Sequence, residues 1–113
     1  MARKHTRASL ASAAPVFAAL GDQTRLAIVA RLCNGGPMSI AQLTEGGNVT
    51  RQAVTKHLRA LEDAGLVRSD RAGRERVWKL RKRRLGEAKR YLDEISDQWD
   101  VAIERLRAMV EKD

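Results

Sequence analysis

Cysteine and aromatic residues are scarce in this chain. The single cysteine, Cys33, has no partner for an internal disulfide, which fits a reducing compartment. The aromatic side chains are limited to Phe17, Trp78, Tyr91 and Trp99. Proteins that bind single-stranded RNA stack its bases on such rings, so this scarcity argues against that class of protein.

Long apolar runs are also lacking, and no stretch approaches the length that spans a membrane. The segment 10–20 is interrupted by Ser12 and Pro15, so we expect no secretory signal peptide. No glycine-rich phosphate loop follows a strand-like run, and no nucleophile, base and acid occur together as a catalytic set. These absences predict a cytoplasmic protein that is not an enzyme and has no membrane partner.

Acidic residues are outnumbered over most of the chain. The formal net charge is +8 over 113 residues. Residues 1–90 hold 19 Lys and Arg against 7 Asp and Glu, whereas residues 91–113 hold 3 against 7. The length suits one domain or one protomer of a dimer. The uneven charge predicts a polyanionic partner for the first part and a different role for the last part.

Residues 50–64 predict a helix with two chemically distinct faces. Val54, Leu58 and Leu61 recur at i, i+4 and i+7, which places them on one apolar stripe. The side chains that we expect to meet DNA in a major groove are Thr50, Arg51, Gln52, Thr55, Lys56 and Arg59. Arginine, lysine and glutamine read base edges there, and the free N–H groups of a helix start favour a phosphate. Taken alone, this helix is equally compatible with a solvated basic surface.

Residues 66–80 predict a β-hairpin directly after that helix. Two short alternating runs flank a turn with Gly73 at its tip. The hairpin carries Arg71, Arg74 and Arg76, which we expect to contact the DNA backbone or the minor groove. A polar-faced helix followed by a basic hairpin is typical of a winged helix-turn-helix, and this order favours DNA binding over a merely solvated helix.

Residues 84–111 predict one long helix with an apolar seam. Its apolar residues are spaced by alternating steps of three and four, with Ala88 completing the repeat. We expect the interface of a homodimer to consist of Leu85, Leu92, Ile95, Trp99, Ala102, Leu106 and Met109. The alternative is that the seam packs on the core of its own protomer. A helix of this length exceeds what so small a core can cover, which favours the dimer.

The chain ahead of residue 50 predicts a flexible arm and three helices. The arm is expected over 1–8, and a winged helix-turn-helix domain over 9–113. The first helix is expected to start near Ser9 or Pro15 and to end at Gly21.

The second and third helices are predicted from their caps. Asp22 is a suitable N-cap for the second helix, and Ser39 and Gln42 form a capping box for a short third helix. The apolar face of the second helix is predicted to hold Leu26, Val29, Ala30 and Cys33. Cys33 is therefore expected to be a buried, inert thiol.

Four motifs follow one another in the chain: ALGDQTRL at 19–26, VTKHL at 54–58, LEDAGLV at 61–67 and VWKL at 77–80. Together they resemble the ArsR/SmtB group of winged helix-turn-helix repressors, closely over 15–80 and loosely over the last helix. The resemblance implies a mainly α fold with a small β-hairpin wing, dimerisation through terminal helices, and binding to a palindromic operator. The last helix with its tryptophan is most similar to the branch that lacks metal-sensing sites.

Metal sensors of that group use cysteine pairs in the third helix, or His and acidic ligands in the last one. Residues 40–45 hold neither Cys nor His, and residues 84–113 hold no His. Because a zinc site needs about four converging ligands, we expect no metal site and no cofactor.

The sequence thus predicts a repressor or autorepressor that binds double-stranded operator DNA at an inverted repeat as a homodimer. A basic dimeric protein associated with RNA or the ribosome remains an alternative. A metal- or redox-responsive repressor is a weaker alternative, because a redox role for Cys33 requires pairing across the dimer. The inducing ligand or partner protein is not identified by any motif.

Overall fold

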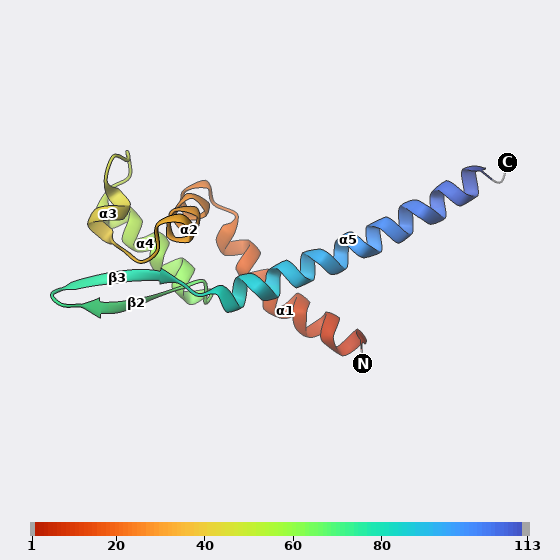
Figure 1. Cartoon of the computed structure of the whole chain (residues 1–113), viewed down its shortest axis with the longest axis horizontal. Helices are drawn as coiled ribbons and strands as arrows, with labels where there is room; N and C mark the ends of the chain where they lie inside the picture. Colours follow the sequence, from red (N-terminus) through yellow and green to blue (C-terminus); the bar gives the residue numbers. More distant parts are fainter. Residues whose placement is uncertain (1, 112–113) are drawn as a thin grey trace.

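The computed structural model describes residues 2–111, and their side chains from residue 10 onward. Along the chain the elements are α1 (Ala2–Leu20), α2 (Gln23–Gly35), β1 (Met38–Ser39), α3 (Ile40–Thr44), α4 (Arg51–Asp63), β2 (Val67–Ala72), β3 (Glu75–Leu80) and α5 (Lys82–Glu111). Helices α2, α3 and α4 gather at one end beside the β2–β3 hairpin, and α5 projects away from them (Figure 1). This arrangement confirms the predicted mainly α fold with a small β-hairpin wing.

The core lies where α4 packs on the base of the hairpin. The predicted stripe of Val54, Leu58 and Leu61 is almost fully buried, and Leu66 and Trp78 are buried beside it. Burial of each such side chain stabilises the fold by about 1.5–3 kcal/mol. This stripe fixes the rotation of α4, so the opposite, polar face must point outward.

The two ends of α4 are defined by local hydrogen bonds. At the start, the Thr50 hydroxyl accepts the Ala53 N–H at 3.1 Å. At the end, Gly65 has φ +79°, and the Leu66 N–H donates to the Leu61 carbonyl at 2.9 Å. A glycine in the left-handed region with this hydrogen bond is a Schellman motif, which turns the chain from α4 into β2.

The sheet has three antiparallel strands in the order β1-β3-β2. The pairing of Ala72 with Glu75 leaves Gly73 and Arg74 as a two-residue turn, with Gly73 at φ +66°. Strand β1, which pairs Met38 with Trp78, was not predicted. Two residues are too few to display the alternation by which a strand is recognised in a sequence.

The predicted start of the first helix is wrong. Helix α1 begins at Ala2 and continues through Pro15, so residues 2–8 of the segment assigned to a flexible arm are helical, and residue 1 lies outside the described residues. The segment is rich in alanine, arginine and lysine, which favour helices, and this preference outweighs its charge.

The predicted apolar face of α2 is also wrong. The buried residues of this helix are Ile28, Val29 and Leu32. Leu26 has 53% of its surface exposed, and Cys33 is exposed. The predicted stripe and the observed stripe share Val29 and differ by a rotation of about 100°. The observed stripe places the larger side chains, isoleucine and leucine, in the core.

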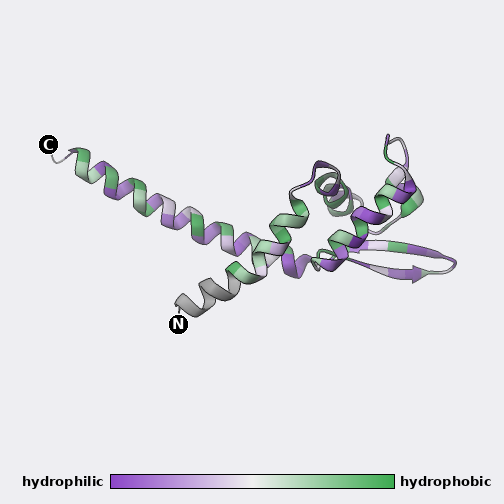
Figure 2. Cartoon of the chain, turned by 180° about the vertical axis from the view of Figure 1, so that it is seen from behind, coloured by the Kyte–Doolittle hydropathy of each residue, from purple (hydrophilic) through white to green (hydrophobic). Residues whose placement is uncertain are grey.

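Helix α5 makes the molecule elongated. The principal extents of the molecule are 68 × 32 × 20 Å, and its radius of gyration is 18.7 Å. A compact chain of this length has a radius of gyration of about 13 Å. Hydrophobic and hydrophilic residues alternate along the projecting helix (Figure 2). Over the described residues, every helix is too short or too polar to cross a bilayer.

Candidate nucleic-acid and dimer interfaces

The polar face of α4 is open to solvent. Arg51, Gln52, Lys56 and Arg59 are exposed, and Thr55 is half-buried. Among the described residues, the four exposed side chains have no hydrogen bond or ion pair with the rest of the chain. The polar face of α4 thus exposes arginine, lysine and glutamine side chains that have no intramolecular partner.

The two threonines of this helix have a more local role. The Thr55 hydroxyl donates to the Arg51 carbonyl at 2.8 Å, which leaves its lone pairs free to accept. Thr50 is exposed, and its side chain caps the helix. The remaining N–H groups of the first turn point along the helix axis, where an anion is favoured.

The tip of the hairpin concentrates positive charge. Arg71 and Arg76 are directly opposite each other on β2 and β3, and Arg74 lies in the turn between them. All three are exposed, and none pairs with an acid among the described residues. Like charges at a cross-strand position repel each other, and a bound anion between them would relieve the repulsion.

Closer to the start of β2, by contrast, an acid partly neutralises the positive charge. Asp70 accepts from Lys79 at 2.9 Å and lies 3.4 Å from Arg68. The hydrogen bond from Lys79 is the main reason that the pKa of Asp70 lies below its usual range. These paired charges of β2 and β3 are therefore less available to an anion than the arginines of the tip.

Two arginines that were not predicted position the helices around α4. Arg31 of α2 donates to the carbonyl groups of Leu43 at 2.9 Å and Gln42 at 3.1 Å, and so holds the end of α3. Arg25 donates through Nε to the Ala19 carbonyl at 2.6 Å. These guanidinium groups donate to carbonyl groups at helix ends, which have no partner within their own helix. No spacing in the sequence predicts this role.

His57 of α4 lies beside Arg25 and the start of α2. Its Nδ1 atom lies 3.5 Å from Nη1 of Arg25 and 3.9 Å from Oδ2 of Asp22. Asp22 caps α2 by accepting the Arg25 N–H, and that bond is the main cause of its lowered pKa. The cluster of Asp22, Arg25 and His57 thus ties the start of α2 to α4.

The apolar seam of α5 divides into two parts. Ala88 is buried, and Leu85 is half-buried and packs on the core of its own chain. The assignment of Leu85 to a dimer interface remains a prediction. Phe17 of α1 and Tyr91 of α5 pack in a tilted arrangement, with ring centroids 6.3 Å apart and ring planes at 50°. The contact between α1 and α5 covers the first turns of the seam, which sequence periodicity cannot distinguish from the later turns.

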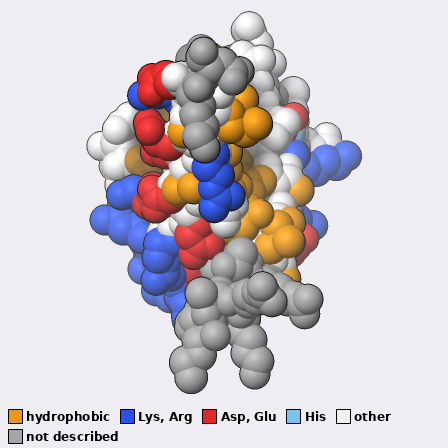
Figure 3. Space-filling view, turned by 90° about the vertical axis from the view of Figure 1, so that its right-hand side faces the viewer, with side chains coloured by type: hydrophobic (Ala, Val, Ile, Leu, Met, Phe, Trp, Pro, Cys, Tyr) orange, Lys and Arg blue, Asp and Glu red, His pale blue; other side chains and the backbone are white. Residues whose placement is uncertain are grey.

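The rest of the seam is exposed. Trp99, Leu106 and Met109 have 66%, 62% and 69% of their surfaces exposed. The exposed members of the predicted interface are Leu92, Ile95, Trp99, Ala102, Leu106 and Met109. Viewed from the end of α5, most hydrophobic side chains lie to the right and most acidic ones to the left, with lysine or arginine on both sides (Figure 3).

Comparison with known proteins assigns this architecture. The family model described as a helix-turn-helix domain matches residues 20–70. The uncharacterized HTH-type transcriptional regulator YuzN of Bacillus subtilis is 44% identical in an alignment of 68 positions that covers 55% of this chain and 74% of that protein. The solved ArsR-like transcriptional regulator from Rhodococcus sp. RHA1 is 35% identical, with a TM-score of 0.78 over 90% of this chain and 95% of that one. The chain belongs to the ArsR family of transcriptional regulators.

Membership in this family confirms the resemblance found in the motifs and makes the protein a DNA-binding transcriptional regulator. The Bacillus subtilis arsenical resistance operon repressor is also similar, with 40% identity over 57 residues, 50% of this chain and 54% of that protein. The aligned part thus spans about half of that relative. The matched residues 20–70 of the ArsR-family regulator include all of α4 and the start of the wing. The absence of a metal site remains a prediction.

Proposed function

We propose that this ArsR-family regulator is a repressor that binds double-stranded operator DNA as a homodimer. The observation that carries the proposal is the exposed face of α4, where Gln52, Lys56 and their neighbours have no partner in the described chain. Such side chains form bidentate hydrogen bonds with base edges, and α-helices fit the major groove. The similarity to a protein named as a repressor supports repression as the outcome of binding.

Each DNA contact has a distinct expected role. Arg51, Gln52, Lys56 and Arg59 read bases, and Thr55 can accept a further hydrogen bond. Thr50 and the first turn of α4 meet a phosphate. Arg71, Arg74 and Arg76 bring the tip of the wing to the adjacent backbone or minor groove, because their charges are unneutralised in the described chain.

A second copy of the chain is the proposed occupant of the exposed α5 seam. An apolar stripe from Leu92 to Met109 on one side of a helix is costly to leave in water. Packing it against the same stripe of a second chain gives a symmetric dimer with two α4 helices. Two equivalent reading helices require an inverted repeat as the operator.

The proposed action is occlusion of a promoter, including the promoter of the protein's own gene, in the cytoplasm. Binding alone accounts for this action, and no catalytic step is needed. Selection of bound fragments from genomic DNA, followed by footprinting, tests the proposal. We expect the selected fragments to share an inverted repeat and to show two protected segments related by symmetry.

Competition with structured RNA tests the main alternative. Excess folded RNA should displace the selected DNA only weakly, because the reading face of α4 lacks aromatic side chains for unstacked bases. If RNA displaces the DNA more effectively than an equal mass of random duplex does, the protein belongs to the RNA-associated class instead.

A further inference from the structure

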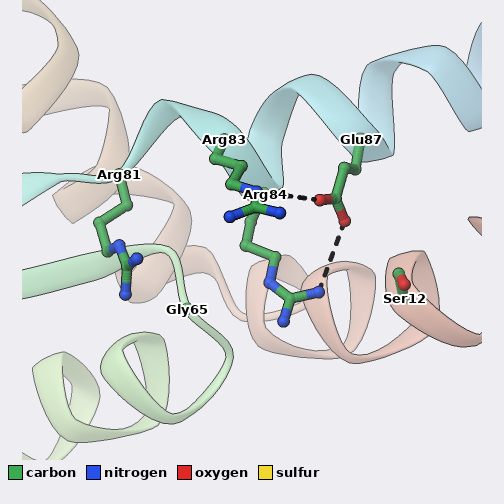
Figure 4. Close-up of a pocket in the computed structure, with 6 residues that line it drawn as sticks. All are labelled: Ser12, Gly65, Arg81, Arg83, Arg84 and Glu87. Carbon is green, nitrogen blue, oxygen red and sulfur yellow. Dashed lines mark hydrogen bonds and ion pairs between the residues drawn. The ribbon is translucent and has the colours of Figure 1, made fainter.

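A basic pocket lies at the base of the wing, away from the residues that we assign to DNA. Its lining residues come from several elements: Ser12, Gly65, Arg81, Arg83, Arg84 and Glu87. The cavity volume is about 340 Å³, which is at the small end of ligand sites at roughly 300–1,000 Å³. Arg81, which precedes α5, extends beside the turn at Gly65, and the Arg84 guanidinium reaches toward the side of Ser12 and Glu87 (Figure 4).

The pocket has more positive than negative charge. Oε1 of Glu87 is 3.7 Å from Nε of Arg83, and Oε2 of Glu87 is 3.4 Å from Nη1 of Arg84. One carboxylate is therefore shared between two guanidinium groups. Arg81 has no ion pair among the described residues, so the pocket keeps an excess of positive charge.

Two features hold the arginines in place. A Cβ atom at position 65 would lie 3.1 Å from both Cγ and Nε of Arg84, so the Arg84 side chain rests closely on a glycine. The Arg81 N–H donates to the Leu66 carbonyl at 2.7 Å, which fixes the link between β3 and α5 beside the same turn. Because packing holds the Arg84 side chain and a backbone bond holds the chain at Arg81, less entropy is lost when an anion binds.

We propose that this pocket binds a small anion that carries a phosphate or diphosphate group, and that the anion controls DNA binding. Planar guanidinium groups form paired hydrogen bonds with phosphate oxygens, and several around one cavity suit a multiply charged group. The pocket joins α1 and α5 to the end of α4 and the base of the wing. A ligand that fits one arrangement of these elements better than another shifts the balance between them.

Direct binding is tested with inorganic pyrophosphate and the full-length protein in a calorimetric titration, with ionic strength held constant by chloride. We expect saturable binding with one site per protomer. Arg81→Gln and Arg84→Gln should each weaken binding by about tenfold or more, because a charge-assisted hydrogen bond is lost. The matched control is Arg90→Gln, which removes an exposed arginine of α5 outside the pocket and should change affinity less than about twofold.

Arg81→Gln keeps the backbone bond to Leu66 and so tests the pocket even if Arg84→Gln unfolds, which a thermal melt of each variant reports. Absence of saturable binding, or equal weakening by Arg90→Gln, would overturn the proposed site. Neither result depends on DNA, so failure of the site and failure of the proposed repressor function are distinguishable.

The coupling between anion binding and DNA binding rests on the proposed function and is tested by a separate experiment. Saturating pyrophosphate should change the operator affinity of the wild-type protein by about fivefold or more and leave Arg81→Gln unaffected. An unchanged operator affinity despite bound pyrophosphate would overturn the coupling. If Arg81→Gln weakens operator binding and lowers its salt dependence without pyrophosphate present, the pocket holds a backbone phosphate of DNA, and the small-anion proposal is wrong.

Discussion

Two groups of arginines in this regulator differ in what their guanidinium groups contact. Arg25 and Arg31 donate to carbonyl groups at helix ends, and their charge is committed to the fold. The exposed group has no acidic partner within the described chain: Arg51, Arg59, Arg71, Arg74 and Arg76. Net charge alone thus overstates the charge that is available to DNA.

Base reading and backbone attraction should separate by mutation. Gln52→Ala or Lys56→Ala should cost about 1–3 kcal/mol on operator DNA and much less on random DNA, because bidentate contacts to bases are lost. Arg74→Ala should weaken binding to both DNAs about equally and reduce the salt slope by roughly one unit. Fluorescence anisotropy over a range of salt concentrations measures these effects. Equal losses on both DNAs for the α4 variants would mean that this helix does not read sequence.

The exposed position of Cys33 has a direct chemical consequence. In the native protein, its thiol should react with a disulfide reagent such as Ellman's reagent at a rate close to that of the unfolded chain, because access is not limited by burial. The measurement is the absorbance of the released thiolate with and without denaturant. Reaction only after denaturation would show that the exposed face of α2 is covered in the assembled protein.

At the scale of elements, the sequence predicts best where the decisive interactions are local. Helix α4 was predicted with nearly its observed bounds, because Thr50, the apolar stripe and Gly65 all act within a few residues. The hairpin followed from the turn at Gly73. Apart from the half-buried Thr55, the predicted site residues on both elements are exposed, and their contacts with DNA remain predictions.

The failures arise where a distant partner decides the outcome. On α2, two apolar stripes compete, and only the packing of α4 and β3 selects the one with Ile28 and Leu32. On α5, the seam is periodic throughout, yet Leu85 meets the protomer's own core and Trp99 meets solvent. Periodicity predicts which face of a helix is apolar, but it does not predict over what length a neighbouring element covers that face.

The exposed part of the α5 seam should hold the dimer together. Trp99→Asp and Ile95→Asp should yield monomers in sedimentation experiments, because a buried unpaired carboxylate costs several kcal/mol. The matched control is Val101→Asp, which makes a similar change on an exposed side of α5 away from the seam and should remain dimeric. If the two seam variants sediment as dimers, the partner lies elsewhere.

At the scale of the whole molecule, the shape links dimerisation to DNA recognition. The elements that we assign to DNA lie at one end, and the free part of α5 lies at the other (Figure 1). A symmetric dimer through α5 therefore sets the separation of two α4 helices. Recognition is then a property of the pair and not of one protomer.

The half-sites of the operator should lie about one helical turn apart, roughly 34 Å between centres, or slightly more. Inserting half a turn of DNA, about 5 base pairs, rotates one half-site to the opposite side of the duplex and should abolish tight binding. Affinity for paired synthetic operators measures the effect, and insertion of a full turn is the control for length. Retained affinity at half a turn would contradict a rigid two-fold dimer.

Helix α5 runs without interruption from the base of the wing to Glu111. Thirty residues of helix span about 45 Å, so a tilt of about 10° at the base moves the far end by about 8 Å. A small change in the angle at which α5 leaves the domain would therefore be magnified at its far end. In a dimer joined through α5, such a change would alter the separation of the two α4 helices by a distance comparable with the width of a DNA groove.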